Sequence, residues 1–344
     1  MFINARYRLS DKVLGKGGFG TVYLGKDEVD GKDVAIKCID LEQKSMRNIA
    51  NRQKIEQEIK LMSILSHKSV VKYYDSCKTD NYWYIIMEYC NKGTLLDVIN
   101  ENSGNERENQ ARYYLTQLRD ALKYLRHLGY VHRDIKPTNI LLTCVKTVGC
   151  DTDDIFDMDE DYFTTESVVV KLADFGLSKC TEADAMMNTV CGSPLYMAPE
   201  VLFNRGYSIK ADLWSFGVMM YQLLIGKHPH EAKTIEQLRS NIDNVEIDFH
   251  LHYGYSPHCY DLLTRLLDKN SSKRLDWDGM FDHQWFDSIS EEIVEPTIDF
   301  SSQIGKIKPV SKLGNSNLSK MKFIDYPSII KPSDSLTKSR IFRY

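Results

Sequence analysis

Alternating apolar positions predict β structure over residues 7–40. Val22 and Leu24 precede the dipeptide Asp30-Gly31, and Val34 and Ile36 follow it. Strands place every second side chain on one face, and Asp-Gly is a strong turn signal. The pattern therefore predicts strands joined by a tight turn.

The apolar spacing becomes helical over residues 42–65, where Ile55, Ile59, Met62 and Leu65 fall on one face. Residues 70–90 return to strand-forming sequence. We therefore expect residues 1–90 to form a small sheet with one long helix.

Beyond Gly93 the spacing is mainly helical. One helical run, over residues 111–125, stops at Gly129, and glycine often ends a helix. Further helices are expected around residues 211–226, 234–242, 259–267 and 276–283. The patterns predict an α+β fold with a small, mainly-β N-lobe and a larger, mainly-α C-lobe, joined near residues 89–93.

Length and composition divide the chain further. Its 344 residues fit one two-lobed domain and a tail. We assign residues 1–90 to the N-lobe and residues 91–286 to the C-lobe. Residues 143–167 contain eight acidic residues and one lysine, which indicates a surface insertion. Residues 287–344 form a Ser/Lys-rich tail that we expect to be flexible.

The charge is unevenly distributed. The net charge of −4 gives no case for a nucleic-acid binder, but Ser301–Tyr344 holds nine Lys/Arg and two acids. One interpretation is a tail that only keeps the chain soluble. The other is a tail that contacts anionic lipid, nucleic acid or the chain's own acidic surface, so the partner of the tail stays open.

The eight cysteines form no CxxC pair, and neither a signal peptide nor a transmembrane run occurs. We expect a reduced, cytoplasmic protein.

The stretch His132–Asn139 carries the clearest chemistry. It places Asp134, Lys136 and Asn139 at short offsets in one loop. A carboxylate can accept a hydroxyl proton, an ammonium can neutralise charge on phosphate, and an amide oxygen can bind a metal ion. This combination suits phosphoryl transfer from a nucleotide to a hydroxyl.

A glycine-rich stretch, Gly15–Val22, fits the pattern G-x-G-x-x-G-x-V. Without a Cβ, glycine lets backbone amides approach phosphates closely. Dinucleotide-binding folds share part of this pattern but need a helix after it. Here two strands follow, so we expect a hairpin that covers a nucleotide. A merely glycine-rich hairpin is the competing interpretation.

Lys37 ends the run Val34–Lys37, seventeen residues after Gly20. A lysine beneath such a hairpin would bind the α- and β-phosphates and needs an acid to hold it. The long helix offers Glu56 and Glu58. Glu58 is the better candidate because it borders the apolar face.

Together these motifs resemble the eukaryotic protein-kinase family. The resemblance runs from Tyr7 to Phe286 and adds Asp174-Phe175-Gly176, Ala198-Pro199-Glu200, Asp212 and Arg274. Lys136 and Ser193 mark the serine/threonine branch. The activation segment, residues 186–197, looks most like that of the autophagy-initiating kinases.

The resemblance implies ATP and Mg²⁺ (or Mn²⁺) as cofactors. Asn139 and Asp174 would bind the metal, and the catalytic residues would be Lys37, Glu58, Asp134 and Lys136. Met87 would be the gatekeeper, with Glu88 and Cys90 offering backbone groups to adenine. The residues implied around ATP are Leu14, Gly15, Lys16, Gly17, Gly18, Phe19, Gly20, Val22, Ala35, Lys37, Met87, Glu88 and Cys90. Glu200 would pair with Arg274, and Asp212 would anchor the catalytic loop.

The resemblance also implies regulation through Arg133, which precedes the catalytic aspartate. Such kinases usually need a phosphate on the activation segment to neutralise this arginine. Thr189 is the expected phosphosite, eleven residues before Glu200, with Lys179 as a second cation. An upstream kinase or autophosphorylation would supply the phosphate. An ordinary loop threonine is the competing interpretation.

Protein substrates are implied as well. The positions that carry acids in arginine-directed kinases are the neutral Thr94, Thr138 and Gln222, so we do not expect arginine direction. Leu177 favours serine over threonine. The residues implied for substrate binding are Ser193, Val190, Pro194 and Met197. We expect serine followed by a hydrophobic residue.

Other classes of protein fit less well. A pseudokinase would be expected to lose Lys37, Asp134 or Asp174, and all three are present. A small-molecule kinase would lack Ala198–Glu200, and a tyrosine kinase would not carry Lys136. A catalytically weak scaffold of kinase fold is the remaining alternative.

Overall fold

The computed structural model describes residues 1–17, 20–43, 46, 48–101, 108–144, 168–176, 178–180, 193–206, 208–249 and 254–287. For Lys179 and Cys180 it describes the backbone alone. Residues 145–167 of the predicted acidic insertion and residues 288–344 of the predicted tail lie outside these ranges, whereas Thr143 and Cys144 belong to strand β8 (Ile140–Cys144).

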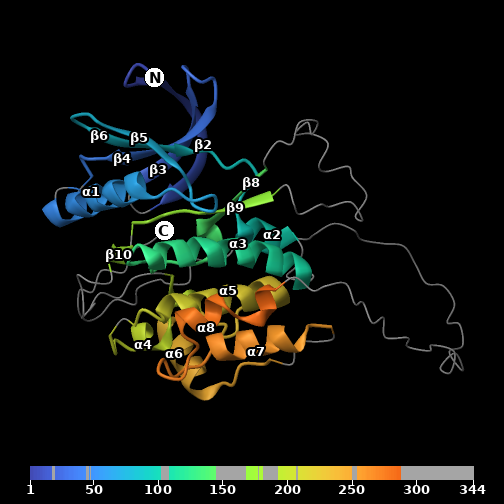
Figure 1. Ribbon diagram of the computed structural model, residues 1–344. Helices are drawn as coiled ribbons and strands as arrows, with labels where there is room; N and C mark the ends of the chain where they lie inside the picture. Colours follow the sequence, from blue (N-terminus) through green and yellow to red (C-terminus); the bar gives the residue numbers. More distant parts are fainter. Residues whose placement is uncertain are drawn as a thin grey trace, which may run out of the picture.

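The N-lobe is one antiparallel sheet with the strand order β1-β2-β3-β4-β6-β5. Its strands are β1 (Phe2–Ile3), β2 (Tyr7–Gly17), β3 (Gly20–Asp27), β4 (Asp33–Asp40), β5 (Tyr73–Lys78) and β6 (Tyr82–Glu88). Helix α1 (Ile49–Ile64) lies against the sheet on the side of the helical lobe (Figure 1). The predicted turn at Asp30-Gly31 is present, with Gly31 at φ +66°.

Two boundaries differ from the sequence expectation. Helix α1 begins at Ile49 rather than near residue 42, because Asn48 caps it by accepting a hydrogen bond from the amide of Ala50 at 2.9 Å. Strand β5 begins at Tyr73, while Val70 forms only an isolated bridge with Leu172.

The first strand, β1, was not predicted because two residues carry no recognisable periodicity. It forms a hairpin with β2 through Asn4 and Ala5, at φ +51° and +53°. Left-handed φ at both turn residues matches the twist of a tight hairpin. The hairpin buries Ile3 and Tyr7 in a small core with Val34, Ile36, Tyr84 and Ile86.

The C-lobe is mainly helical and lies below the sheet in Figure 1. Its helices are α2 (Leu95–Glu101), α3 (Glu108–His127), α4 (Pro199–Leu202), α5 (Ala211–Ile225), α6 (Ile235–Asn244), α7 (Pro257–Leu266) and α8 (Trp277–Phe281). Its strand pairs are β7 (Tyr130–Val131) with β10 (Lys179–Cys180), and β8 (Ile140–Cys144) with β9 (Val168–Leu172). The expected two-lobed α+β fold is confirmed, and the expected helices lie within a few residues of their predicted positions.

Helix α5 occupies the centre of the C-lobe. Thirteen of its fifteen residues are buried, from Ala211 to Leu224. A helix that is apolar on all sides must be surrounded by protein. Its sequence, the longest apolar run of the chain, therefore marks the core. None of the helices among the described residues is long and apolar enough to cross a membrane.

Two histidines follow α5, which ends at Gly226 with φ +80°. His230 is 4% exposed, and neither of its ring nitrogens has a hydrogen-bond partner among the described residues. Nδ1 of His228 also lacks one there. Burial lowers the pKa of both rings from 6.5 to about 4. The folded chain therefore holds both rings neutral.

We expect stability to fall as the pH drops from 6.5 to about 4, because the unfolded rings take up protons that the folded rings do not. Above this window both states carry neutral rings. In His230→Phe, the midpoint of urea unfolding should therefore depend less steeply on pH in this window than it does in the parent. The exposed His127 provides the control, and His127→Phe should keep the parent slope. A parent slope in His230→Phe would contradict the assignment.

Candidate active site

The loop His132–Asn139 is held in place by Asp212 of α5. The two carboxylate oxygens of Asp212 accept hydrogen bonds from the amides of His132, at 2.8 Å, and Arg133, at 2.9 Å. Asp212 is 1% exposed, and Arg133 adopts a left-handed φ of +71°. Such a backbone conformation costs about 1–3 kcal/mol and persists where surrounding contacts enforce it. The buried carboxylate supplies that constraint.

Three polar side chains of this loop meet. Nζ of Lys136 lies 2.8 Å from Oδ2 of Asp134, and Nδ2 of Asn139 donates to the same oxygen at 3.0 Å. The Asn139 amide also donates to the carbonyl of Asp134 at 2.9 Å. All three residues are buried. Because the amide nitrogen is used in this way, the amide oxygen of Asn139 is the atom available for a metal ion.

Asp174 lies beside this loop, although it comes 35 positions after Asn139 in the sequence. The preceding residue, Ala173, donates its amide to the carbonyl of Asn139 at 2.9 Å. Asp174 itself has φ +63°. Phe175 is 1% exposed, and its ring packs edge-on against the ring of His132, with the two ring centroids 5.2 Å apart. Burial of Phe175 fixes the turn that presents the Asp174 carboxylate.

Lys37 of β4 and Glu58 of α1 form a closed ion pair, with Nζ and Oε1 2.7 Å apart. Their side chains are 14% and 4% exposed. Burial alone would lower the pKa of Lys37, but the carboxylates of Glu58 and Asp174 outweigh it and raise the pKa. The expected partner, Glu58 rather than Glu56, is therefore the one that contacts the lysine.

The charge of Asp174 is fixed by its neighbours. Protein atoms crowd its carboxyl group, which would raise the pKa, yet Lys37 and, less strongly, His132 and Lys136 lower it. The residue still keeps exposed surface. Asp174 is therefore an accessible anion at neutral pH.

The glycine-rich stretch forms the end of the β2–β3 hairpin, where Gly17 pairs with Gly20. A Cβ on Gly20 would lie 2.4 Å from the carbonyl oxygen of Cys38, whereas one on Gly15 would meet nothing within 4 Å. Gly20 is thus required for close packing on β4, which the sequence analysis did not anticipate. Gly18 and Phe19 lie outside the described residues.

The segment after β6 connects the two lobes. Met87 packs against the main core, which is the large cluster of buried apolar residues that runs from Leu61 of α1 through Phe175 to α3 and α5. The amide of Glu88 donates to the carbonyl of Lys72 at 2.8 Å. Neither backbone group of Cys90 has a partner among the described residues. Burial and the charge of Glu88 raise the pKa of the Cys90 thiol to about 12. Cys90 therefore offers free backbone groups beside an unreactive thiol.

An ion pair at this connection was missed by sequence reasoning. Oε1 of Glu88 lies 2.8 Å from Nζ of Lys171 in β9, and Oε2 accepts from the amide of Lys72 at 3.1 Å. Lys171 lies three positions before Asp174, on the face of β9 opposite to the buried Val170 and Leu172. Alternation in β9 could have placed Lys171 on that face, but not its partner.

The remaining implied ATP contacts lie on β2, β3 and β4. Leu14 is 37% exposed and Ala35 is 7% exposed. Gly15 pairs with Val22, and Lys16 pairs with Thr21. These residues therefore line the hairpin above Lys37, which is in turn paired with Val22.

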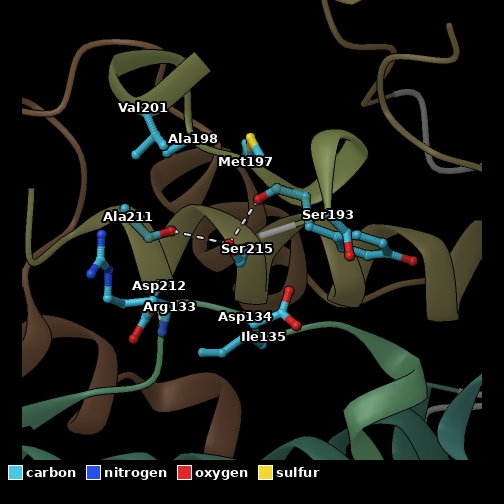
Figure 2. A pocket seen from close by; sticks show the side chains of 11 residues that line it. Arg133, Asp134, Ile135, Ser193, Met197, Ala198, Val201, Ala211, Asp212 and Ser215 are labelled. Atoms are coloured by element: carbon cyan, nitrogen blue, oxygen red, sulfur yellow. Dashed lines mark hydrogen bonds between the residues drawn. The ribbon is translucent and has the colours of Figure 1, made fainter. Parts of the chain in front are cut away.

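A pocket lies between the catalytic loop and the segment before α4. Arg133, Asp134 and Ile135 lie on one side of it, and Ser193 and Met197 lie on the other (Figure 2). Tyr196 also lines the pocket. Ser215 fixes Tyr196 by donating to its carbonyl at 2.7 Å. The hydroxyl of Tyr196 donates to Gln222. Ser193 and Met197 therefore line the same pocket as Asp134. Pro194 lies between them in a 3₁₀ turn.

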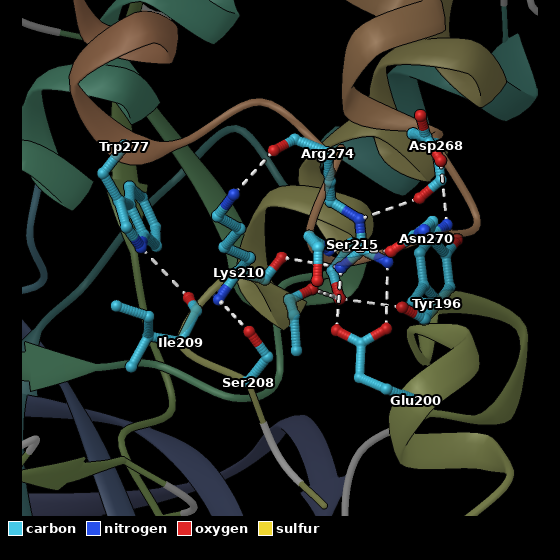
Figure 3. Close-up of polar contacts among 12 residues, drawn as sticks. Tyr196, Glu200, Ser208, Ile209, Lys210, Ser215, Asp268, Asn270, Arg274 and Trp277 are labelled. Carbon is cyan, nitrogen blue, oxygen red and sulfur yellow. Dashed lines mark hydrogen bonds and ion pairs between the residues drawn. The ribbon is translucent and has the colours of Figure 1, made fainter. Parts of the chain in front are cut away.

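A buried ion pair supports this segment from below. Nη1 and Nη2 of Arg274 donate to the two oxygens of Glu200 at 2.8 and 2.9 Å (Figure 3). Arg274 also donates to the carbonyls of Asp268 and Lys210, at 3.1 Å each. Arg274 is 1% exposed. A bidentate pair with further backbone contacts is the arrangement in which a buried ion pair is best compensated.

Three of the implied regulatory and substrate residues are not placed. Thr189 and Val190 lie outside the described residues, and Lys179 is described only by its backbone pairing with Val131. Arg133 is buried, at 6% exposure.

Comparison with known proteins supports a single family. Residues 9–286 match the protein kinase domain model. R517/R518 of Acanthamoeba polyphaga mimivirus, designated a serine/threonine-protein kinase, is 44% identical over 350 residues, which cover 93% of this chain and 76% of that protein.

Two further relatives are cellular. Serine/threonine-protein kinase atg1 of Dictyostelium discoideum is 33% identical, over 80% of this chain and 38% of its own length. Serine/threonine-protein kinase ULK1 of Homo sapiens is 34% identical, over 84% and 26%. This chain thus spans well under half of these two relatives. The resemblance inferred from the activation segment is confirmed, and the chain belongs to the eukaryotic-type serine/threonine protein kinases, related to the autophagy kinases.

Proposed function

We propose that this chain transfers the γ-phosphoryl group of ATP to serine and threonine hydroxyls of proteins, using the residues assembled above. One observation carries the proposal. Nζ of Lys37 lies 2.7 Å from Oε1 of Glu58. The negative charge of Asp174, beside the catalytic loop, also acts on Lys37 and helps to raise its pKa. Three segments distant in the sequence thus bring their charges together as phosphoryl transfer requires.

The described residues fit a metal-nucleotide complex. Among them no group of three His, Cys, Asp or Glu gathers into a metal cage. Mg²⁺, however, is usually held by one or two protein ligands and the nucleotide phosphates. The free amide oxygen of Asn139 and the anionic Asp174 supply those ligands. Bound Mg-ATP supplies the phosphoryl group and neutralises its charge.

The chain's own residues would do the rest. Asp134 would orient the substrate hydroxyl and accept its proton, and Lys136, 2.8 Å from that carboxylate, would offset charge beside it. Lys37 would bind the phosphates, and the Gly15–Gly20 hairpin would cover them. The backbone groups of Cys90 would meet the adenine edge. Met87 would limit the space behind it.

A catalytically weak scaffold of the same fold is the second candidate. The closed Lys37–Glu58 pair and the complete set of Asp134, Asn139 and Asp174 argue against it, because a scaffold needs none of these polar side chains. We also propose a reducing, cytoplasmic setting, supported by the free thiols of Cys38, Cys77, Cys90 and Cys259 in the described part of the chain. Residues 1–90 and 91–286 would act as the two lobes, with residues 287–344 as an appended tail.

We expect the full chain to incorporate labelled phosphate from γ-labelled ATP into a generic protein substrate, mainly as phosphoserine. In a peptide library, substrates with a hydrophobic residue after the serine should be preferred, because Pro194 and Met197 offer an apolar surface there. The neutral Thr94, Thr138 and Gln222 give upstream arginine no partner. Dominant selection for upstream arginine, or phosphate on tyrosine alone, would contradict this specificity.

Phosphorylation of Thr189 should raise activity, since Arg133 is a buried cation next to the catalytic aspartate. We expect Thr189→Ala to lower the initial rate about tenfold or more, which corresponds to one charge-assisted contact of about 1.4 kcal/mol or above. Mass spectrometry should find phosphate on Thr189 in the active chain. Equal rates in Thr189→Ala and the parent, with both unaffected by phosphatase, would rule out this switch.

A further inference from the structure

The segment that would receive the substrate rests on two separate apolar cores. This platform segment, Ser193–Met197, packs Tyr196 and Met197 against the main core. Leu195 and Met197 also pack against a small separate core formed by Leu202, Leu238 and Ile242. Met197 thus touches both cores. The position of the platform segment depends on how the small core is attached.

The small core joins two helices. Leu202 is the last residue of α4, and Leu238 and Ile242 are the buried residues of α6. No residue of α6 belongs to the main core of the described part of the chain. The buried residues of α6 therefore reach the platform segment through the small core, and the contact between α6 and α4 helps to fix their position.

One polar contact secures that junction. Nε and Nη2 of Arg239, on α6, donate to the carbonyl oxygen of Leu202 at 3.0 and 2.8 Å. The last carbonyls of a helix lack partners within the helix, and no backbone amide among the described residues donates to this one. A charged donor makes a bond about twice as strong as a neutral one. Arg239 therefore ties the end of α4 to α6.

Helix α4 is consequently held at two points. Glu200 is bound to Arg274 on the side of the main core, and Leu202 is bound to Arg239 on the side of α6. The first tie fixes α4 to the lobe. The second decides where α6 places Leu238 and Ile242 beneath Leu195 and Met197. Met197 also lines the pocket next to Asp134 (Figure 2).

We propose that Arg239 is a positioning residue for substrate selection. By fixing α6 on the end of α4, it sets the depth of the apolar surface that Met197 offers to the residue after the target serine. The inference rests on the proposed function and deepens it, because it names the contact that shapes this part of the site. Arg239 itself touches neither substrate nor nucleotide.

The test compares full-length variants on two peptides that differ only in leucine or alanine after the serine. Arg239→Met keeps the aliphatic stem and removes both donors. We expect the KM of the leucine peptide to rise about three- to tenfold, and its advantage over the alanine peptide to shrink, while the KM of ATP stays unchanged. Arg239→Lys, which retains one charged donor, should recover part of the loss. Arg265→Met, which removes an exposed arginine of α7, should behave as the parent.

A second measurement does not depend on activity. The amides of Tyr196 and Met197 donate to the carbonyls of Ser193 and Pro194, and their hydrogen exchange reports on the platform segment. Exchange should be faster in Arg239→Met than in Arg265→Met. Suppose that the parent chain phosphorylates no peptide but exchange is still faster in Arg239→Met. That result would contradict the proposed function, and it would still support the role of Arg239 in positioning the platform segment.

Two results would overturn the role of Arg239. One is unchanged exchange together with an unchanged KM for the leucine peptide. The other is an equal rise in KM for both peptides and for ATP with a lower melting temperature, which would show a general structural role. If Arg239→Met does not fold, the same comparisons apply to Arg239→Lys, with a smaller expected shift.

Discussion

Asp174→Ala should lower the rate of phosphoryl transfer by about 10³-fold, the loss typical of removing one preorganised electrostatic contact in an active site. The parent carboxylate is anionic at neutral pH because Lys37, opposing the effect of burial, lowers its pKa. Alanine removes that charge from the place where the phosphates and metal would bind. Initial rates with γ-labelled ATP at saturating protein substrate measure the effect.

Backbone strain must be separated from loss of charge, since Asp174 has φ +63°. Asparagine tolerates this conformation better than alanine. Asp174→Asn should therefore melt close to the parent and still lose most of its activity. Asp278→Ala, on the exposed first turn of α8, is the matched control and should keep the parent rate. Substantial activity in Asp174→Asn would contradict the assignment of Asp174 as a metal ligand.

Arg274→Met should lower the free energy of unfolding by about 3–5 kcal/mol, because it leaves the carboxylate of Glu200 buried without its charged partner. Both oxygens of Glu200 lose their guanidinium donors, and the carbonyls of Asp268 and Lys210 lose theirs as well. Urea unfolding followed by tryptophan fluorescence gives the free energy directly.

The paired substitution distinguishes the cause. Adding Glu200→Leu to Arg274→Met removes the unpaired charge, so the double variant should regain part of the lost stability. Arg265→Met breaks an exposed pair with Asp261 and should cost no more than about 1 kcal/mol. A double variant no more stable than Arg274→Met would show that the backbone contacts of Arg274, rather than the ion pair, hold the segment.

Periodicity was sufficient to predict the two lobes, most helices and the glycine-rich hairpin, because burial imposes a spacing that survives in the sequence. The choice of Glu58 over Glu56 followed from the same rule, since only Glu58 borders the face of α1 that packs inward. Motif order was sufficient to indicate the family. It could also indicate that Asp174 and the loop from His132 belong to one site.

Contacts between segments were not predictable in the same way. The pair Glu88–Lys171 joins residues whose relation depends on how β9 lies against the strand connection. The bond from Arg239 to the carbonyl of Leu202 involves a backbone atom, which every residue carries, so no side-chain pattern marks it. Strand β1 was not predicted because Ile3 stabilises it by packing into a tertiary core, and no local repeat in the sequence marks it.

The ladder between β8 and β9 has a further consequence for how the chain can vary. Cys144 pairs with Val168, so the two points between which residues 145–167 are inserted are neighbours in the sheet, about 5 Å apart between Cα atoms. The entropy of closing a loop grows only slowly with its length. This junction is therefore a place where evolution can lengthen, shorten or replace sequence at little thermodynamic cost. The same property makes it a suitable position for grafting a reporter domain onto the enzyme.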